Sequence, residues 1–325
     1  MQTQWTPPPE HAHLQPVRVL TDHADQVLGI AFHPTRPVLA TASTDGAVRL
    51  WNLMAGSVQV LVKMNSAWPT AVAYSPDGQV LAVGDSSGTA WLWDMKRGRP
   101  LQQYAIHRFA FLAIAFSPNG QVLATSSLDG STYLWEMTSG TPPITLEGHT
   151  DIVEGIAFHP AGQLLATASQ DGSVRLWQAP RGRPLTILFQ SQGWVTKVAF
   201  SPDGRWLACG LETGEIQVWE MQAGQRHWSV AGPKGSILDI TFSPDNRLLA
   251  TGNEDSTARL WSVETGLLVG SASGHEGPVP VVAFSPQATQ TLGALSVQLI
   301  DPEALLLATG SHDGTVRLWS VTVEP

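Results

Sequence analysis

The sequence predicts an all-β fold built from seven copies of one unit. Tryptophan recurs every 42 residues, at Trp51, Trp93, Trp135, Trp177, Trp219 and Trp261. The next one, Trp319, follows after 58 residues, so the seventh unit carries an insertion of 16 residues. A His-Pro or Ser-Pro pair recurs in register with the tryptophans, from His33-Pro34 to Ser285-Pro286. Two motifs held at one long period are typical of a repeat architecture.

One unit, residues 149–177, shows the expected strands most completely. An alternating segment, Val153–Phe158, predicts a first strand, and Leu164–Ser169 predicts a second after a turn at residues 159–162. Asp171-Gly172 then forms a tight turn, and a third strand ends at Trp177. Each unit is therefore expected to be a meander of antiparallel strands.

Composition limits the classes of function. Of the 325 residues, 43% are hydrophobic and 14% are charged, which is enough apolar surface for a sizeable core. A formal net charge of -9 argues against a general affinity for nucleic acid or anionic membranes, because phosphates are bound by an excess of Lys and Arg. The single cysteine, Cys209, excludes an intrachain disulfide and fits a reducing compartment. Since neither a secretory signal nor an apolar segment of about 20 residues is visible, we expect a cytoplasmic protein.

The first residues lack the periodic pattern. We expect residues 1–15 to form a flexible tail ahead of a single domain at residues 16–323. His11 and His13 offer two imidazoles to a transition metal, but zinc sites use at least three protein ligands. We therefore expect a solvated tail without a metal. The sequence contains no phosphate-binding loop, nucleotide fingerprint or zinc-finger spacing, so no cofactor is expected.

The repeat carries the signature of a known family. Gly148-His149 and Gly274-His275 stand at the start of two units, and Trp93-Asp94 ends another. Units of this length and pattern resemble the WD-repeat family, over residues 16–323, although the residue after Trp departs from Asp in the other units. The resemblance implies a seven-bladed β-propeller with four-stranded antiparallel blades around a channel. It also implies that an N-terminal strand, at residues 17–20, closes the last blade and shields its edge.

The resemblance further implies a structural tetrad in each blade. It joins a His before the first strand, a Ser or Thr in the second strand, an Asp in the next turn and the Trp of the third strand. Four blades carry it as His23, Ser43, Asp45 and Trp51; His107, Ser127, Asp129 and Trp135; His149, Ser169, Asp171 and Trp177; and His275, Ser311, Asp313 and Trp319. The imidazole is expected to bridge the carboxylate and the hydroxyl, with each bond contributing about 0.5–1.5 kcal/mol.

Ser, His and Asp side chains grouped in this way also resemble the triad of a hydrolase. Their repetition in four blades, each time with a Trp, favours a structural role, because buried polar groups need partners. Ser311, His312 and Asp313 are adjacent in sequence and therefore point in different directions. We predict no catalytic residues and a protein that is not an enzyme.

Three blades depart from the tetrad, and we expect them to be the softer part of the ring. The corresponding residues are Asn65, Asp85 and Ser87 in blade 2, Ser191, Leu211 and Thr213 in blade 5, and Pro233, Asn253 and Asp255 in blade 6. In blade 2 the Asp and Ser positions are exchanged, which would preserve a bond in reverse. The joint loss of His, Ser and Asp in blade 5 leaves no charged group without its partner.

Partners of this family commonly bind the face around the channel mouth, where two positions per blade point. The first set is Leu28, Thr70, Leu112, Glu154, Thr196, Leu238 and Pro280, and the second is Thr44, Ser86, Leu128, Gln170, Glu212, Glu254 and His312. The hypothetical partner site consists of Trp68, Phe109, Glu154, Trp194, Glu212, Asp239, Glu254 and His312.

Charge is unevenly distributed over that site. Acidic residues gather on blades 4 to 6, with Lys197 and Lys234 as partial counterweights, and blades 1 to 3 are more apolar. This predicts a non-enzymatic scaffold for a partner protein or peptide, with a basic segment over blades 4 to 6 and an apolar anchor towards blades 2 and 3. Two simpler interpretations stay open. The glutamates would only solvate the face, and Trp68 and Trp194 would pack against neighbouring blades.

Three alternatives to a scaffold stay open: an enzyme with its site in the channel, a metal site there, and a propeller associated with nucleic acid. Glu212, Glu254 and His312 hold equivalent positions on successive blades. Packed sheets stand about 10 Å apart, whereas metal ligands lie about 2–2.6 Å from one ion, so these side chains would converge only at the channel. The net charge speaks against nucleic acid.

The insertion, residues 287–304, is the last distinctive segment. It falls between the first and second strands of blade 7, on the face opposite the channel mouth, and it is unusually apolar for a loop. It either extends the hairpin and packs on the blade or forms an exposed element for docking a partner.

Overall fold

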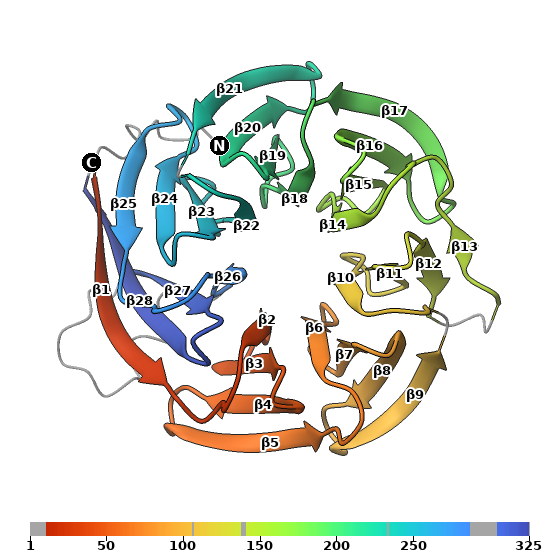
Figure 1. Cartoon of the computed structure of the whole chain (residues 1–325), viewed down its shortest axis with the longest axis vertical. Coiled ribbons are helices and arrows are strands. Elements are labelled where there is room, and N and C mark those ends of the chain that lie inside the picture. Colours follow the sequence, from red (N-terminus) through yellow and green to blue (C-terminus); the bar gives the residue numbers. More distant parts are fainter. Residues whose placement is uncertain (1–10, 106, 138–140, 233, 287–303, 325) are drawn as a thin grey trace, which may run out of the picture.

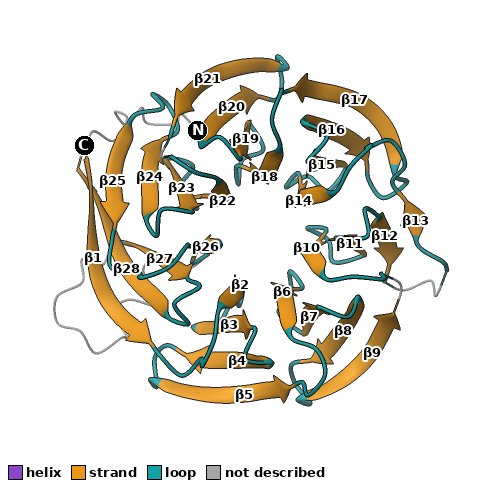
Figure 2. Ribbon diagram, viewed as in Figure 1, coloured by secondary structure: helices purple, strands orange, loops and turns teal. Residues whose placement is uncertain are grey.

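The computed structural model describes residues 11–105, 107–137, 141–232, 234–286 and 304–324. In these residues, seven four-stranded antiparallel sheets stand around a central channel, which confirms the predicted seven-bladed β-propeller (Figure 1). Figure 2 shows the described ring as strands joined by loops. No helix in this part of the chain is long and apolar enough to cross a membrane.

Each of blades 1 to 6 contains four consecutive strands, here called a to d from the channel outwards. Blade 1 is β2 (Val27–Phe32), β3 (Val38–Ser43), β4 (Ala47–Asn52) and β5 (Ser57–Lys63), and blade 2 is β6 (Pro69–Tyr74), β7 (Val80–Asp85), β8 (Thr89–Asp94) and β9 (Arg99–Ala105). Blade 3 is β10 (Phe111–Phe116), β11 (Val122–Ser127), β12 (Thr132–Glu136) and β13 (Ile144–Thr145), and blade 4 is β14 (Val153–Phe158), β15 (Leu164–Ser169), β16 (Ser173–Gln178) and β17 (Arg183–Gln190). Blade 5 is β18 (Val195–Phe200), β19 (Trp206–Leu211), β20 (Glu215–Glu220) and β21 (Gln225–Ala231), and blade 6 is β22 (Ile237–Phe242), β23 (Leu248–Asn253), β24 (Ala258–Ser262) and β25 (Leu268–Ala272). Blade 7 is β26 (Val281–Phe284), β27 (Leu305–Gly310), β28 (Val316–Glu324) and, outermost, β1 (His11–Leu20).

The recurrent Ser-Pro and Asp-Gly motifs form the turns between strands. In the a–b turn of blade 5, the Ser201 hydroxyl donates to Asp203 Oδ1 at 2.6 Å and accepts a bond from the Trp206 backbone N–H at 2.9 Å. The b–c turn of blade 4 requires Gly172, whose φ is +81° and whose Cβ, if present, would lie 2.5 Å from the Ser191 carbonyl oxygen. Both motifs therefore fix the reversals that bring the strands into register.

The N-terminal strand closes the ring, as predicted, but it is longer than predicted. β1 pairs with β28 from His11 to Leu20, so residues 11–15 belong to the last blade and not to a flexible tail. The reason is burial: Ala12 is buried, and Leu14 packs with it against Val269 of blade 6. Residues 1–10, the remainder of the expected tail, lie outside the described residues.

The core lies mainly between blades. One buried cluster joins Ala166 and Leu176 of blade 4 to Val198 and Leu207 of blade 5, and the other clusters likewise include residues of neighbouring blades. A blade is thus stabilised by its neighbours, and the ring needs closure to cover both ends. The insertion at 287–304 lies outside the described residues except for Ala304, which is buried beside Leu306.

Candidate functional site

The inner strands direct side chains towards the channel through a repeated irregularity. In blades 1 to 6, the pairing of strands a and b shifts around the second residue of strand a, as between Val153 and Gly155 in blade 4. Such a β-bulge leaves one residue unpaired and re-aims its side chain. The residues at these positions are Leu28, Thr70, Leu112, Glu154, Thr196 and Leu238, which make up the first predicted set in these blades.

The channel encloses a cavity of about 170 Å³, and the first predicted set lines it only in part. Leu28, Thr70, Leu112 and Pro280 lie in its wall. Thr196 is buried instead, and its hydroxyl donates to the Ile237 carbonyl oxygen at 2.6 Å. The residue after each bulge completes the wall, namely Gly29, Ala71, Ala113, Gly155, Lys197 and Asp239. The small residues at four of these six positions are the sequence signal for this second lining.

Lys197 and Asp239 are the charged residues of the cavity wall, and separate contacts hold them. Lys197 Nζ donates to the Glu154 carbonyl oxygen at 3.2 Å, and the Val282 backbone N–H donates to Asp239 Oδ2 at 2.8 Å. Each contact crosses to a neighbouring blade. Burial raises the pKa of Asp239 to about 6, although Lys197 and the backbone N–H groups act in the opposite direction.

Replacing Asp239 by Asn should therefore stabilise the protein in a pH-dependent way. The folded-state pKa of about 6 exceeds the ordinary value of 3.8, so stability from this carboxyl is present below pH 3.8 and lost as the pH rises through 6. Asp239→Asn keeps an oxygen for Val282 and removes the buried charge. We expect a gain of about 1–3 kcal/mol in the free energy of unfolding at pH 7.5, and little gain at pH 4, in urea denaturation. A gain that is equal at both pH values would contradict this origin.

The glutamates of the mouth have structural partners. Glu212 accepts a bond from the Trp194 backbone N–H at 3.0 Å, and Glu254 accepts one from the Ser236 backbone N–H at 2.9 Å. Glu154 Oε1 accepts a hydrogen bond from the side-chain amide of Gln170 at 2.6 Å. These side chains thus shape the loops between blades while their carboxylates keep the mouth acidic.

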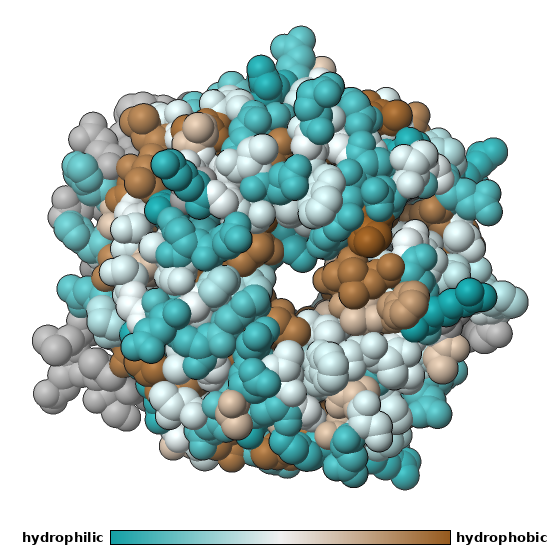
Figure 3. All heavy atoms as spheres, viewed as in Figure 1, coloured by the Kyte–Doolittle hydropathy of each residue, from teal (hydrophilic) through white to brown (hydrophobic). Residues whose placement is uncertain are grey.

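Large hydrophobic side chains project from the loops of the same face. Phe109 is 58% exposed, Leu128 47%, and Trp68 and Trp194 each 46%. The two tryptophans are therefore half in solvent. Figure 3 shows hydrophobic surface beside the channel over β10 and β11. The mouth thus combines an apolar side on blades 2 and 3 with an acidic side on blades 4 to 6, next to Trp194.

His312 does not join the glutamates. Its backbone N–H donates to the Pro278 carbonyl oxygen at 3.0 Å, and burial lowers the pKa of its imidazole. The carboxylates of Glu212 and Glu254 face the backbone N–H groups of Trp194 and Ser236 in the loops before strand a. Across the described residues, His, Cys, Asp and Glu side chains form no group of three that is suited to a metal ion.

The tetrads use a different hydroxyl from the predicted one. In blade 4, His149 Nδ1 lies 2.8 Å from Asp171 Oδ2, and its Nε2 lies 2.7 Å from the hydroxyl of Thr167. Trp177 Nε1 donates to that same hydroxyl at 2.8 Å. Burial lowers the pKa of His149, which favours the neutral ring. A neutral ring that carries its proton on Nδ1 would donate to Asp171 and accept from Thr167 at Nε2.

The prediction of serine at this position was wrong. The threonines that contact the His and Trp are Thr41, Thr125, Thr167 and Thr309. Ser43, Ser127, Ser169 and Ser311 lie two residues further along, and each hydroxyl donates to a backbone carbonyl of the loop before strand a. Each of these serines also accepts the backbone N–H of the turn Asp. The serine therefore fixes the turn, and the threonine links the imidazole to the indole.

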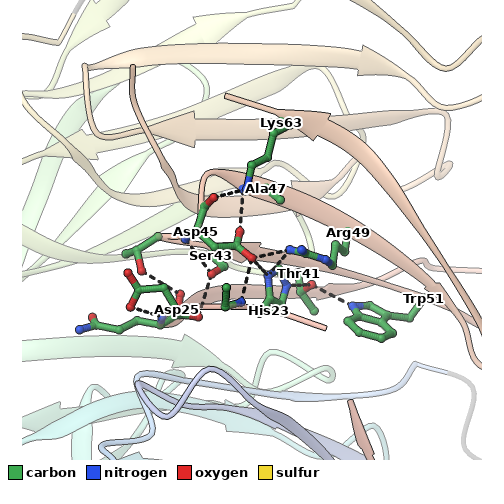
Figure 4. Close-up of polar contacts among 12 residues, drawn as sticks. His23, Asp25, Thr41, Ser43, Asp45, Ala47, Arg49, Trp51 and Lys63 are labelled. Carbon is green, nitrogen blue, oxygen red and sulfur yellow. Dashed lines mark hydrogen bonds and ion pairs between the residues drawn. The ribbon is translucent and has the colours of Figure 1, made fainter. Parts of the chain in front are cut away.

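Blade 1 carries the most elaborate tetrad (Figure 4). Arg49 Nη1 lies 2.7 Å from Asp45 Oδ2 and also faces His23, and Lys63 Nζ donates to the Asp45 carbonyl oxygen. Burial, together with Arg49, lowers the pKa of His23 to about 4. Backbone N–H donors and His23 hold the pKa of Asp45 well below its usual range in spite of burial. His23, Asp45 and Arg49 are buried or half-buried and bonded to one another, which gives them a structural role.

The irregular blades replace this arrangement in different ways. In blade 2, Val83 stands in the threonine position, and the Trp93 indole N–H has no partner among the described residues. Asp85 accepts bonds from Ser87 Oγ at 2.6 Å and from Trp91 Nε1 at 2.9 Å. In blade 5, Trp219 Nε1 donates to Gln217 at 3.2 Å. Blade 6 keeps the Thr251–Trp261 bond at 3.1 Å. The softness of these three blades stays a prediction.

Known families match this chain along most of its length. Residues 89–296, more than half of the chain, match the family model described as IFT122 first beta-propeller. Residues 14–52 and 58–94 match the model described as WD domain, G-beta repeat. No curated protein matches the chain. The matched segments together run from residue 14 to residue 296, apart from residues 53–57, and end before β27 and β28 of blade 7.

Proposed function

Because this chain belongs to the WD-repeat β-propeller family, we propose that it is a non-enzymatic scaffold that binds a partner protein on the channel-mouth face. The observation that carries the proposal is the exposure of Trp68, Phe109, Leu128 and Trp194 on the loops of one face. Aromatic side chains held in a rigid frame are the anchors that dominate protein interfaces. Exposed apolar groups that gather on one face, rather than lie scattered, mark sites of interaction.

Charge supports a partner with a basic segment. Glu154, Glu212 and Glu254 lie on three successive blades beside Trp194, and their bonds to loop groups leave oxygens free for a cation. An acidic rim of this kind steers a cationic partner and fixes its orientation. We therefore orient the basic segment over blades 4 to 6 and the apolar anchor over Phe109 and Leu128.

The buried chemistry fits a scaffold better than an enzyme. The His and Asp residues of the tetrads are bonded within their own blades, as His149 and Asp171 are. The channel wall offers one carboxylate and one ammonium group, and both are held by backbone groups of neighbouring blades. These contacts stabilise the ring, and the variable residues of the mouth are left for recognition.

Substitutions at the mouth should separate binding from folding. We expect the double variant Phe109→Ser and Trp194→Ser to capture at least tenfold less partner from native lysate than the intact chain does. Quantitative mass spectrometry measures the captured amount. Hot-spot aromatic residues commonly contribute about 2 kcal/mol or more. The matched control, Leu185→Ser with Leu268→Ser, removes equally exposed residues from outer strands β17 and β25 and should keep the partner.

A second pair of variants isolates the charge. Glu154→Gln and Glu212→Gln preserve an acceptor for Gln170 and Trp194 and remove two charges. We expect slower association and a weaker dependence of the rate on salt, because charges of the rim act mainly on association. If both mouth variants capture as much partner as the intact chain, and the Leu185→Ser, Leu268→Ser control captures less, the partner binds the outer strands and not the channel mouth.

A further inference from the structure

A second recessed surface lies between blades 2 and 3, away from the channel mouth. Its cavity measures about 360 Å³ and is bounded by the a–b turns of both blades, residues 75–77 and 118–120. Those turns belong to the face opposite the mouth. Leu92, Phe116 and Met137 contribute apolar lining, and Leu101 and Gln102 of β9 form its outer edge.

The protein itself shows what fits such a groove. β9 pairs with β8 so that Gln102 stands opposite Leu92, and β21 pairs with β20 so that Trp228 stands opposite Val218. Gln102 and Trp228 therefore occupy the same position in blades 2 and 5, three repeat units apart. Trp228 is half-buried between blades 5 and 6, and its Nε1 donates to the Val263 carbonyl oxygen at 2.7 Å.

The surroundings of the two positions correspond residue by residue. Trp228 packs against the cluster that contains Trp206, Val218, Phe242 and Val263. The residues three units earlier are Val80, Leu92, Phe116 and Met137, and all four line the groove between blades 2 and 3. The indole that covers this apolar surface in one half of the ring has no counterpart in the other half, where Gln102 is exposed. Val80, Phe116 and Met137 are partly exposed there, and Leu92 is buried beneath them.

Charge beside the groove indicates the flanks of its ligand. Lys96 and Arg97 lie in the turn between β8 and β9, Arg99 begins β9, and all three are exposed. Arg97 pairs with Asp94 at 2.9 Å, which leaves Lys96 and Arg99 as the cations near Leu101. Asp77, the acidic residue in the lining, is engaged in its own turn by Ser75 Oγ at 2.6 Å and the Gln79 backbone N–H at 3.0 Å. Lys96 and Arg99 therefore place positive charge near the Leu101 edge of the groove, although the whole chain carries a net charge of -9.

We infer that the groove between blades 2 and 3 binds an indole side chain from an acidic segment of a partner protein. The indole takes the place that Trp228 takes in blade 5, with its N–H directed at the carbonyl group of Met137, the counterpart of Val263. Acidic residues beside it face Lys96 and Arg99. The apolar residues and the Asp77 carboxylate of the lining favour an uncharged side chain over a phosphate group, and aromatic anchors are common in interfaces.

The test uses the full chain and a blocked peptide, Asp-Glu-Trp-Glu-Asp, with binding measured by isothermal calorimetry. Gln102→Trp supplies the indole from within and should weaken peptide binding at least tenfold. Gln102→Ala is the matched control and should keep or improve binding, since it leaves the groove open. A peptide with Ala in place of Trp should bind at least tenfold more weakly. The protein variant Lys96→Glu with Arg99→Glu should bind the original peptide severalfold more weakly.

Two further measurements discriminate other occupants. Failure of the peptide to bind, or equal affinity for Gln102→Trp and Gln102→Ala, overturns the inference. Binding of anionic phosphatidylserine vesicles or duplex DNA more tightly than the peptide, with no effect of Gln102→Trp, would assign the basic turn to lipid or nucleic acid and also overturns it. A dimer that Gln102→Trp dissociates, with no peptide binding, would make a second copy the occupant. None of these results depends on the channel-mouth site.

Discussion

Removing residues 1–20 should lower the free energy of unfolding by on the order of 5 kcal/mol relative to a chain that lacks residues 1–10 alone. β1 pairs with β28 along its whole length, and Leu20 and Ala12 are buried. Burial of Leu-sized side chains contributes about 1.5–3 kcal/mol each, and Leu14 and Val17 add partly buried surface. Loss of the strand also exposes the edge of β28 to other chains. Urea denaturation followed by tryptophan fluorescence measures the difference.

A point substitution keeps this prediction testable if the truncated chain aggregates. Leu20→Ala leaves the strand in place and should cost about 2–5 kcal/mol, as core Leu substitutions do. Gln15→Ala changes an exposed residue of the same strand and serves as the control. If the 1–20 deletion, the 1–10 deletion and the intact chain unfold at one urea concentration, closure by β1 contributes nothing to stability.

The start of β1 shows why this boundary was missed in the sequence. His11, Ala12, His13 and Leu14 alternate between exposed and inward positions, which is a strand pattern. The pattern is short and rests on one small and one large apolar residue, so it resembles a tail. What orders it is blade 6, where Gly270 has no side chain and the Ala12 carbonyl oxygen and Leu14 approach its backbone. That partner is distant in sequence, and no local pattern indicates it.

The bulk of the architecture, in contrast, was readable because it is repeated. The tryptophan period, the Ser-Pro turns and the Asp-Gly turns recur in register, and each reports a local reversal of the chain. The candidate site was readable only in part. Exposure of Phe109 and Trp194 depends on how neighbouring loops pack, and the place of Lys197 and Asp239 in the channel wall depends on bulges that sequence spacing alone does not locate.

The choice between threonine and serine in the tetrads shows another limit. Thr167 and Ser169 are two residues apart in β15, so they point to the same face of the sheet, and spacing does not distinguish them. The position of the histidine ring along the strand decides which hydroxyl it meets. Blade 6 distinguishes the two positions: it keeps Thr251 but has Asn253 in place of the serine. Its Trp261 still donates to Thr251, so the threonine position is the one that bonds the indole.

Thr167→Val should therefore cost about 2–4 kcal/mol of the free energy of unfolding, and Ser169→Ala only about 1 kcal/mol. Valine has nearly the shape of threonine, so the substitution leaves no cavity, but it deprives the Trp177 indole N–H and His149 Nε2 of their partner. Each buried polar group left without a bond costs about 1–3 kcal/mol. Ser169→Ala removes bonds to the Asp151 carbonyl group and the Asp171 backbone N–H at a less buried turn.

The same pair of substitutions in blade 7, Thr309→Val and Ser311→Ala, repeats the comparison where the closing strand lies. Thr309 likewise contacts His275 at 2.8 Å and Trp319 at 3.0 Å, so the ranking should be the same. Urea denaturation gives both differences, and the fluorescence of the indole reports its environment. If Ser169→Ala and Ser311→Ala were the more damaging in both blades, the turn and not the threonine link would dominate. If the threonine substitutions cost more, the link between the imidazole, the hydroxyl and the indole contributes more to the stability of each blade than the turn does. The reason is that one hydroxyl there satisfies two buried groups at once.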